Sequence, residues 1–325
     1  MSRARKHKKY EALIYRCHGL APLRTAVAHP CDEWSLRGAV EAAASKILKL
    51  LLVGPEARIR TLAASLDLDL DDLRVVDQPH SHAAAAKAVE LIRAGEADAL
   101  MKGSLHTDEL MAEVVRKDTG LRTARRISHV FIMDVPTYAK PLFITDAAVN
   151  IFPTLEDKAD IVQNAIDLAL ALGNPMPKVA ILSAVETITS RIPSTLEAAA
   201  LCKMAERGQI TGAVLDGPLG FDIAISREAA AVKHIASAVA GDADILVVPD
   251  LEAGNMLAKE LTFLADADAA GIVLGARVPI ILTSRADNLR TRMASCAVAA
   301  LYAHARHVGE IHKPAASGIT PDAKL

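Results

Sequence analysis

The sequence has few aromatic residues and no excess of positive charge. Phe, Trp and Tyr make up 3% of the 325 residues, and 37 basic residues stand against 39 acidic ones, for a formal net charge of −2. Proteins that bind single-stranded nucleic acid stack bases on aromatic side chains, and those that bind duplexes gather positive charge against the phosphates. We therefore expect no nucleic-acid partner.

Cysteines and long apolar runs are also scarce. The four cysteines, Cys17, Cys31, Cys202 and Cys296, form no Cys-x-x-Cys pair, which suits reduced thiols in a cytosolic enzyme better than a disulfide framework. Uncharged stretches such as 293–305 are well short of the roughly 20 residues that a membrane-spanning helix needs. The basic residues at 1–9 lead into no apolar run of the kind that a secretion signal has. These features predict a cytoplasmic protein outside the membrane.

Several nucleotide and catalytic motifs are missing. The chain has no GxxxxGK[ST], GxGxxG, HExxH or GxSxG segment, so nucleotide hydrolysis, dinucleotide redox chemistry, zinc proteolysis and serine hydrolysis lack their usual signatures. Cys17-His18 and His29-Pro30-Cys31 juxtapose possible metal ligands, but their spacing matches no zinc module. We predict no metal site.

Short aliphatic runs alternate with Ala-rich stretches of helical period, a pattern typical of βα units around a largely parallel sheet. Apolar residues make up 51% of the chain, enough for two α/β domains. The fold class is therefore predicted to be α/β. Expected strands are Thr25–Ala28, Lys49–Val53, Leu73–Val76, Ala97–Met101, Val130–Met133, Leu142–Thr145, Val179–Leu182, Ala213–Asp216, Ile245–Val248, Ile272–Val273 and Ile280–Leu282.

Capping signals mark several expected helix starts. Thr154 with Asp157 predicts a capping box for a helix that opens a second domain, and Ser194 with Glu197 predicts another. Ser81 is a further expected cap.

The informative polar residues follow the strands, because ligands of open α/β sheets sit beyond the carboxyl ends of the strands. Lys102-Gly103-Ser104-Leu105-His106-Thr107 is a glycine turn that leads into a helix start. Lys102, Ser104 and Thr107 offer an ammonium group and hydroxyls, and the backbone offers N–H groups, to a phosphate. The alternative is an ordinary βα loop.

Three arginines precede a Ser-His pair in Leu121-Arg122-Thr123-Ala124-Arg125-Arg126-Ile127-Ser128-His129. Guanidinium groups suit phosphate oxyanions through bidentate hydrogen bonds, so this run predicts a basic subsite. A solvated basic turn is the alternative.

Two further strand ends carry candidate residues. Asp146 and Asn150 follow the strand ending at Thr145, where they either line a pocket or cap a helix. Asn255 follows Gly254, which permits close backbone approach, and its amide can donate to a carbonyl or phosphate oxygen.

The last candidate segment is Leu282-Thr283-Ser284-Arg285-Ala286-Asp287. Acyl transfer to phosphate needs a guanidinium group for the phosphoryl group, a donor for the tetrahedral oxyanion and a carboxylate for the thiol proton. Ser284, Arg285 and Asp287 supply these groups. Helix capping by Ser284 and Asp287 is the alternative.

Read in order, the strand-end segments resemble the phosphate acetyl/butyryltransferase family, nearest its butyryltransferase-like branch. The segments that carry the resemblance are Met101-Lys102-Gly103-Ser104, Ser128-His129-Val130, Thr145–Ile151, Pro177–Ala180, Asp216-Gly217-Pro218-Leu219, Val247-Val248-Pro249-Asp250, Glu252-Ala253-Gly254-Asn255 and Leu282–Asp287. The N-terminal part, including Val27–Asp32, resembles the transferase half of bifunctional enoyl-CoA hydratase/phosphate acetyltransferase proteins. The chain has no room for a hydratase half, so we expect transferase chemistry alone.

The resemblance implies an isocitrate/isopropylmalate dehydrogenase-like fold, a homodimer, and coenzyme A as a substrate with no bound cofactor. It implies a first domain of residues 1–149 plus 284–325, a second of 150–283, and an active site in the cleft between them. It further implies that Arg285 binds phosphate and that Ser284 assists the tetrahedral intermediate. The activity that the resemblance implies is the interconversion of acyl-CoA plus phosphate with acyl phosphate plus coenzyme A, with phosphate acetyltransferase as the favoured form.

The chain departs from the acetyltransferase branch at two positions. It has Thr291 where that branch has its proposed aspartate base, and Ala112 where that branch has an arginine. Asp287 as the base, and Arg125 or Arg126 as the substitute cation, are hypotheses.

Other functions stay open from the sequence. The alternatives are a butyryltransferase with a longer acyl preference, a non-catalytic acyl-CoA-binding protein of the same fold, and a decarboxylating dehydrogenase. Acyl-chain length depends on a few pocket volumes, and one methylene is worth about 1–3 kcal/mol in discrimination.

Overall fold

The structure, a computed structural model, describes residues 8–283 and 287–311 and confirms the α/β class. Its contacts group the chain into two compact units. Unit 1 comprises Met1–Leu13 and Ser128–Gly271, and unit 2 comprises Ile14–Ile127 and Ile272–Leu325. These boundaries differ from the division at Asn150 and Ser284 that the sequence suggests, and that domain assignment stays a prediction.

Unit 2 is built on a mainly parallel sheet with the strand order β3-β2-β1-β4-β11. Its strands are β1 (Leu23–Ala28), β2 (Leu48–Gly54), β3 (Arg74–Asp77), β4 (Ala99–Lys102) and β11 (Ile280–Ile281). The end of β10 (Asp268–Leu274) adds an antiparallel strand, in which Ile272 and Val273 pair with Ile281 and Ile280. Because β1, β4 and β11 run in the same direction, the residues that follow them meet at one edge of this sheet.

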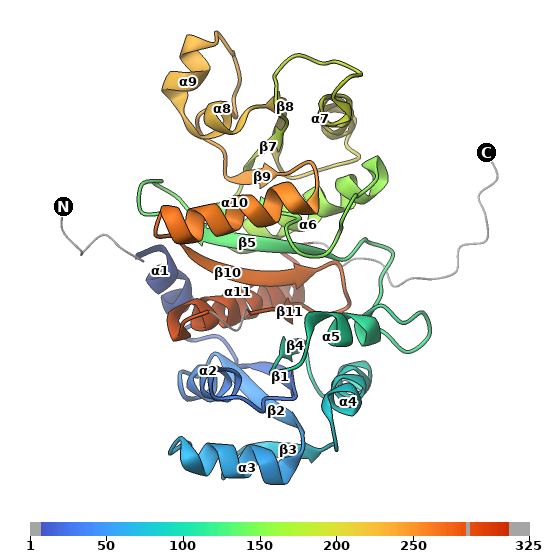
Figure 1. The fold of residues 1–325 in the computed structure, drawn as a ribbon, viewed down its shortest axis with the longest axis vertical. Coiled ribbons are helices and arrows are strands. Elements are labelled where there is room, and N and C mark those ends of the chain that lie inside the picture. Colours follow the sequence, from blue (N-terminus) through green and yellow to red (C-terminus); the bar gives the residue numbers. More distant parts are fainter. Residues whose placement is uncertain (1–7, 284–286, 312–325) are drawn as a thin grey trace. The chain divides into compact units, whose positions relative to one another are not determined.

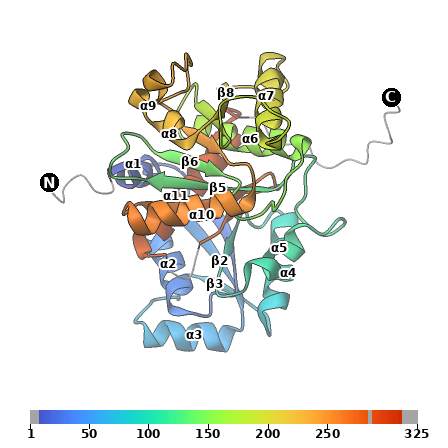
Figure 2. The ribbon, with the colours of Figure 1, turned by 45° about the horizontal axis from the view of Figure 1, so that its top comes forward.

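The helices of unit 2 are α2 (Glu33–Ala44), α3 (Glu56–Ser65), α4 (Ser81–Arg93), α5 (Thr107–Val114) and α11 (Leu289–Val308). Figures 1 and 2 both show α4 and α5 side by side. α2 packs against α11, where Gly38 lies so close to Arg292 that a Cβ atom at residue 38 would be 3.0 Å from Arg292 Cδ. The short α1 (Lys8–Arg16) crosses the boundary between the units.

Unit 1 has the strand order β10-β5-β6-β9-β7-β8, with the first part of β10 at its edge. The pair β5 and β6 is antiparallel, whereas β6, β9, β7 and β8 pair in parallel. The elements are β5 (Ser128–Asp134), β6 (Leu142–Thr145), α6 (Leu155–Ala171), β7 (Lys178–Leu182), α7 (Pro193–Glu206), β8 (Val214–Leu219), α8 (Phe221–Ile225), α9 (Arg227–Val232), β9 (Ile245–Val247) and α10 (Leu251–Leu264).

Of the three helix N-caps expected from the sequence, one is confirmed and two are wrong. Thr154 and Asp157 form the box that begins α6. The box at Ser194 is wrong, because α7 begins at Pro193 with Ile192 as its N-cap. Ser81 is not a cap either, since it lies inside α4 and His80 Nδ1 accepts the Ala83 N–H instead.

All four cysteines are free thiols, and burial is the main cause of their raised pKa values. Their pKa values rise to about 11 for Cys17 and Cys31 and to about 12 for Cys202 and Cys296. These thiols therefore stay protonated at neutral pH and are poor nucleophiles.

Within residues 8–283 and 287–311, no helix is long and apolar enough to cross a membrane. Within the same ranges, no group of three or more His, Cys, Asp or Glu side chains is placed to hold a metal ion.

Candidate functional site

The ends of β1 and β4 meet at a glycine that has no space for a side chain. Ala28 lies opposite Lys102 in the sheet, and the Gly103 N–H donates to Ala28 O at 2.9 Å. A Cβ atom on Gly103 would be 2.3 Å from Ala28 O and 2.5 Å from His29 O. The glycine turn expected from the sequence is therefore a close backbone contact, and it holds Lys102 and Ser104 beside β1.

Ser104 is fixed by the residues that follow β1. Its Oγ lies 2.9 Å from His29 O and 3.0 Å from His29 Nδ1, and it accepts the Cys31 N–H at 3.2 Å. Burial lowers the pKa of His29, and the Arg58 charge adds to this effect. A neutral imidazole thus stands beside Ser104 at neutral pH, a feature that the sequence motif His29-Pro30-Cys31 did not reveal.

Lys102 and Thr107 complete the loop that was expected to bind an anion. The Lys102 side chain is buried, and its Nζ lies 3.4 Å from Gly103 O. Thr107 is half-buried and is the first residue of α5, whose N-terminal N–H groups favour negative charge. The structure thus places a buried ammonium group, a hydroxyl and a helix start on one loop.

Arg125 and Arg126 lie on a second loop of unit 2, which is tied to the segment before β11. Thr123 Oγ1 donates to Gly275 O at 2.5 Å, and the Arg277 N–H donates to Leu121 O at 2.8 Å. The Arg125 side chain is half-buried and that of Arg126 is exposed. Both cations thus lie on a loop that these two hydrogen bonds anchor, and the basic subsite stays a prediction.

Ser284 and Arg285 lie outside the described residues, and Asp287 is the described member of that segment. Arg292 Nη1 donates to Thr283 Oγ1 at 3.0 Å, and Arg292 Nε donates to the backbone carbonyl of Asp287 at 3.2 Å. Burial lowers the pKa of Arg292, while the Asp287 and Asp32 carboxylates oppose this effect. Arg292 therefore joins the end of β11 to the start of α11.

Arg292 was missed by the sequence analysis because its role depends on contacts that a local pattern does not encode. Asn288, rather than Asp287, caps α11, since Asn288 Oδ1 accepts the Thr291 N–H at 2.9 Å. Asp287 therefore does not cap α11, and the capping alternative for this residue is wrong.

In unit 1, Asp146 is surrounded by hydrogen-bond donors. Its Oδ1 accepts the N–H groups of Ala148 and Val149 at 2.9 and 3.0 Å, and its Oδ2 accepts from Asn150 Nδ2 at 2.5 Å. Burial raises the pKa of Asp146, although these donors act in the opposite direction. Asp146 and Asn150 therefore fix the turn after β6. Neither residue caps a helix, because the next helix, α6, has Thr154 as its N-cap. The pocket-lining alternative stays a prediction.

Ser128 and His129 are both buried in β5. Asn164 Nδ2 donates to Ser128 Oγ at 2.8 Å, and Thr145 Oγ1 donates to the backbone carbonyl of His129 at 2.8 Å. Burial lowers the pKa of His129 to about 3, and its ring packs edge-on against Phe131 with centroids 4.3 Å apart. His129 is thus neutral at physiological pH and offers no cation to a phosphate.

Asn255 is joined to the same turn from α10. Its Nδ2 donates to Ala147 O at 3.2 Å, and a Cβ atom on Gly254 would be 2.9 Å from Asp146 O. The close approach that the sequence suggested for Gly254 is therefore real. In unit 1 the structure brings Ser128, His129, Asp146, Asn150 and Asn255 into one network, and their role in substrate binding stays a prediction.

The phosphate acetyl/butaryl transferase family model matches residues 78–300. A phosphate acetyltransferase from Rhizobium meliloti is 68% identical over 303 residues, which cover 93% of this chain and 96% of that protein. A phosphate butyryltransferase from Clostridium acetobutylicum is 42% identical over 296 residues, which cover 91% of this chain and 98% of that protein.

Solved structures agree with these relatives. A branched-chain phosphotransacylase from Enterococcus faecalis V583 aligns with a TM-score of 0.74 at 30% identity, over 87% of this chain and 99% of that one. The 4-hydroxythreonine-4-phosphate dehydrogenase from Klebsiella pneumoniae has a TM-score of 0.54 at 12% identity, over the same shares of the two chains, and fits the expected dehydrogenase-like fold loosely. The likeness to bifunctional hydratase/transferase proteins stays a prediction. Since both the family model and a relative of 68% identity span most of its length, the chain belongs to the phosphate acetyl/butaryl transferase family.

Proposed function

We propose that the chain interconverts acyl-CoA plus phosphate with acyl phosphate plus coenzyme A, with acetyl as the acyl group. The observation that carries this proposal is the 68% identity to a phosphate acetyltransferase across 93% of the chain, against 42% to a phosphate butyryltransferase. The proposed reaction needs no metal and no nicotinamide, and coenzyme A is a substrate rather than a bound cofactor.

The chemistry starts from the thiol of coenzyme A. Its sulfur forms a bond to the carbonyl carbon of acetyl phosphate, the bond from that carbon to the phosphate oxygen breaks, and phosphate leaves with the electron pair. A free thiol has a pKa of about 8.5 and is mostly protonated at neutral pH, so a base must take its proton. We assign this base to Asp287, the carboxylate that follows Ser284 and Arg285 in the sequence. The N-cap of α11 is the neighbouring Asn288.

The remaining site residues have binding roles in this proposal. Arg285 holds the phosphoryl group and Ser284 stabilises the tetrahedral oxyanion, by resemblance to the family. The loop that carries Lys102, Ser104 and Thr107 favours an anion through its ammonium group and helix start. Arg125 and Arg126 suit the phosphates of coenzyme A.

We further propose a cytoplasmic homodimer. The compartment is supported by four cysteines that form no disulfide, and the dimer by the family resemblance. Light scattering of the purified protein tests the dimer directly, since a monomeric mass would contradict it.

The test of the reaction is thioester formation followed by ultraviolet absorbance. Coenzyme A is mixed in turn with acetyl, propionyl and butyryl phosphate, without added metal or nicotinamide. We expect turnover with acetyl phosphate to be the fastest. Faster turnover with butyryl phosphate would favour the butyryltransferase alternative, and silence with all three from folded protein would favour an acyl-CoA-binding protein.

Arg292→Gln is expected to lower kcat about 10-fold or more and to lower the free energy of unfolding by about 2 kcal/mol, because one buried and one partly buried acceptor lose a charged donor. The matched control is Arg290→Gln, since Arg290 is exposed one position beyond the helix start. We expect Arg292→Lys to recover part of the stability but little of kcat, because an ammonium group does not reproduce the forked geometry. A folded Arg292→Gln protein with normal kcat would contradict the positioning role.

A further inference from the structure

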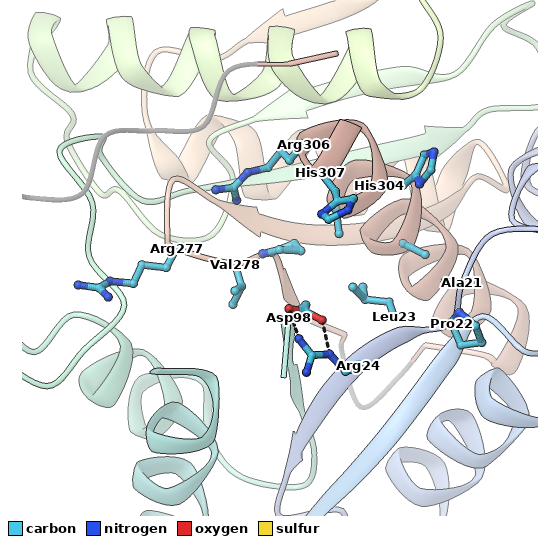
Figure 3. A pocket seen from close by; sticks show the side chains of 13 residues that line it. Ala21, Pro22, Leu23, Arg24, Asp98, Arg277, Val278, His304, Arg306 and His307 are labelled. Atoms are coloured by element: carbon cyan, nitrogen blue, oxygen red, sulfur yellow. Dashed lines mark hydrogen bonds and ion pairs between the residues drawn. The ribbon is translucent and has the colours of Figure 1, made fainter. Parts of the chain in front are cut away.

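Unit 2 contains a cavity of about 540 Å³ at the edge of its sheet where the parallel strands begin. The start of β1, the residue before β4, the turn before β11 and the last turns of α11 line it, as Figure 3 shows. The loop of Lys102 and the segment of Asp287 follow the opposite, carboxyl ends of these strands. The cavity is therefore separate from the candidate site residues of unit 2.

The lining carries more positive than negative groups. The acidic residue in the lining is Asp98. Its two carboxylate oxygens accept hydrogen bonds from Arg24 Nε at 2.7 Å and Arg24 Nη2 at 2.9 Å. Arg24 and Asp98 thus neutralise each other. Arg277, His304, Arg306 and His307 also line the cavity. Within residues 8–283 and 287–311, their side chains form no ion pair, and the Arg306 guanidinium lies 5.7 Å from the centre of the Tyr302 ring.

The C-terminus of α11 accounts for only part of the positive charge in the cavity lining. Arg306 lies in the last turn of α11, where a positive charge interacts favourably with the helix dipole. Arg277 comes from the turn before β11 and owes nothing to that dipole. Two arginines from separate elements, Arg277 and Arg306, thus line one cavity, and Asp98 is the carboxylate in its lining.

The rest of the lining is apolar. It consists of Ala21, Pro22, Leu23, Val278, Pro279, Ala300 and Ala303. Small-molecule sites in proteins are mostly apolar clefts of about 300–1,000 Å³ with a few polar groups that fix orientation. Guanidinium groups in turn bind phosphate through paired hydrogen bonds.

We propose that this cavity binds a phosphate ester of nucleotide size, with the ring of the ligand on the apolar floor and its phosphates at Arg277 and Arg306. The proposal does not depend on the proposed catalytic function, because it uses none of the site residues. Figure 3 shows Arg306 at the upper left and Arg277 at the left, both extending to the left, and the Arg24–Asp98 pair in the lower centre.

The test is calorimetric titration of ADP into the full chain saturated with coenzyme A, so that any coenzyme A site is already filled. We expect one ADP per chain, and at least 10-fold weaker binding to the double variant Arg277→Gln/Arg306→Gln. The control variant Arg60→Gln/Arg207→Gln removes two exposed arginines elsewhere and should bind normally. In NMR spectra, the ring signals of His304 and His307, assigned by substitution, should shift on titration.

Three outcomes of the ADP experiments would overturn the proposal. These are no ADP binding to the saturated protein, equal binding to the two double variants, or histidine signals that stay unchanged while ADP binds. Citrate, titrated in parallel, separates a phosphate site from a general anion site, and equal affinity for citrate would also overturn it. The acyl-transfer assay on the two double variants distinguishes a failure of this proposal from a failure of the proposed reaction. Both double variants should retain normal kcat.

Discussion

Asp287→Asn is expected to lower the rate of acetyl-CoA formation about 100-fold or more at pH 7, the loss typical of a missing general base. The deficit should shrink as the pH rises past about 8.5, because coenzyme A then forms its thiolate without help. The measurement is kcat/KM for coenzyme A with acetyl phosphate between pH 6.5 and 9.5. Arg292 holds Asp287 through its backbone carbonyl, so the asparagine variant keeps this contact.

The control for this variant is Asp118→Asn, an exposed carboxylate on the loop that follows α5, which should leave the profile unchanged. A deficit of the same size at every pH would assign Asp287 to positioning rather than proton transfer. An unchanged rate at pH 7 would remove it from the site.

Gly103→Ala is expected to cause the largest loss of stability, about 3 kcal/mol in the free energy of unfolding. The new Cβ atom would lie 2.3 Å from Ala28 O, 2.5 Å from His29 O and 2.6 Å from His29 C. All three are backbone atoms, so relief requires β1 and β4 to separate. Thermal unfolding and denaturant midpoints measure the loss, and kcat should fall because Lys102 and Ser104 move with the strand end.

Gly95→Ala is the matched control for this prediction. Gly95 has a φ of +76° and no heavy atom within 4 Å of its ideal Cβ position, so alanine there meets only backbone strain of about 1–2 kcal/mol. If Gly103→Ala were no less stable than Gly95→Ala, the close approach of the two strands would not be a strict constraint.

Local pattern predicted the regular elements well where burial and capping agreed. The strand Leu142–Thr145 has the bounds expected from the sequence, and the capping box of Thr154 and Asp157 begins α6 as expected. The Ser194 box failed because a Ser-x-x-Glu spacing also arises inside a helix. There Ser194 Oγ pairs with Ser183 Oγ at 2.8 Å, and Glu197 pairs with Lys158.

The candidate site was predicted in part. The residue types after each strand identified the loop of Lys102 and the turn of Asp146, because strand ends can be located from apolar runs. The contacts that define these residues are not local. The donors around Asp146 include the backbone N–H of His129, and Arg292 reaches Thr283 from the next helix. Such partners depend on tertiary packing, which no spacing rule in a single sequence encodes.

The length of α11 has a mechanical consequence. Its 20 residues form a rod of about 30 Å. Arg292, near the N-terminal end of α11, donates to the backbone carbonyl of Asp287. Arg306, near the C-terminal end, lines the cavity described above. A ligand that displaced this rod along its axis would alter the free energy of the Asp287 segment. By thermodynamic reciprocity, a substrate that favoured one position of α11 would change the affinity of the cavity for its ligand. The factor would equal the one by which that ligand changes the affinity for the substrate.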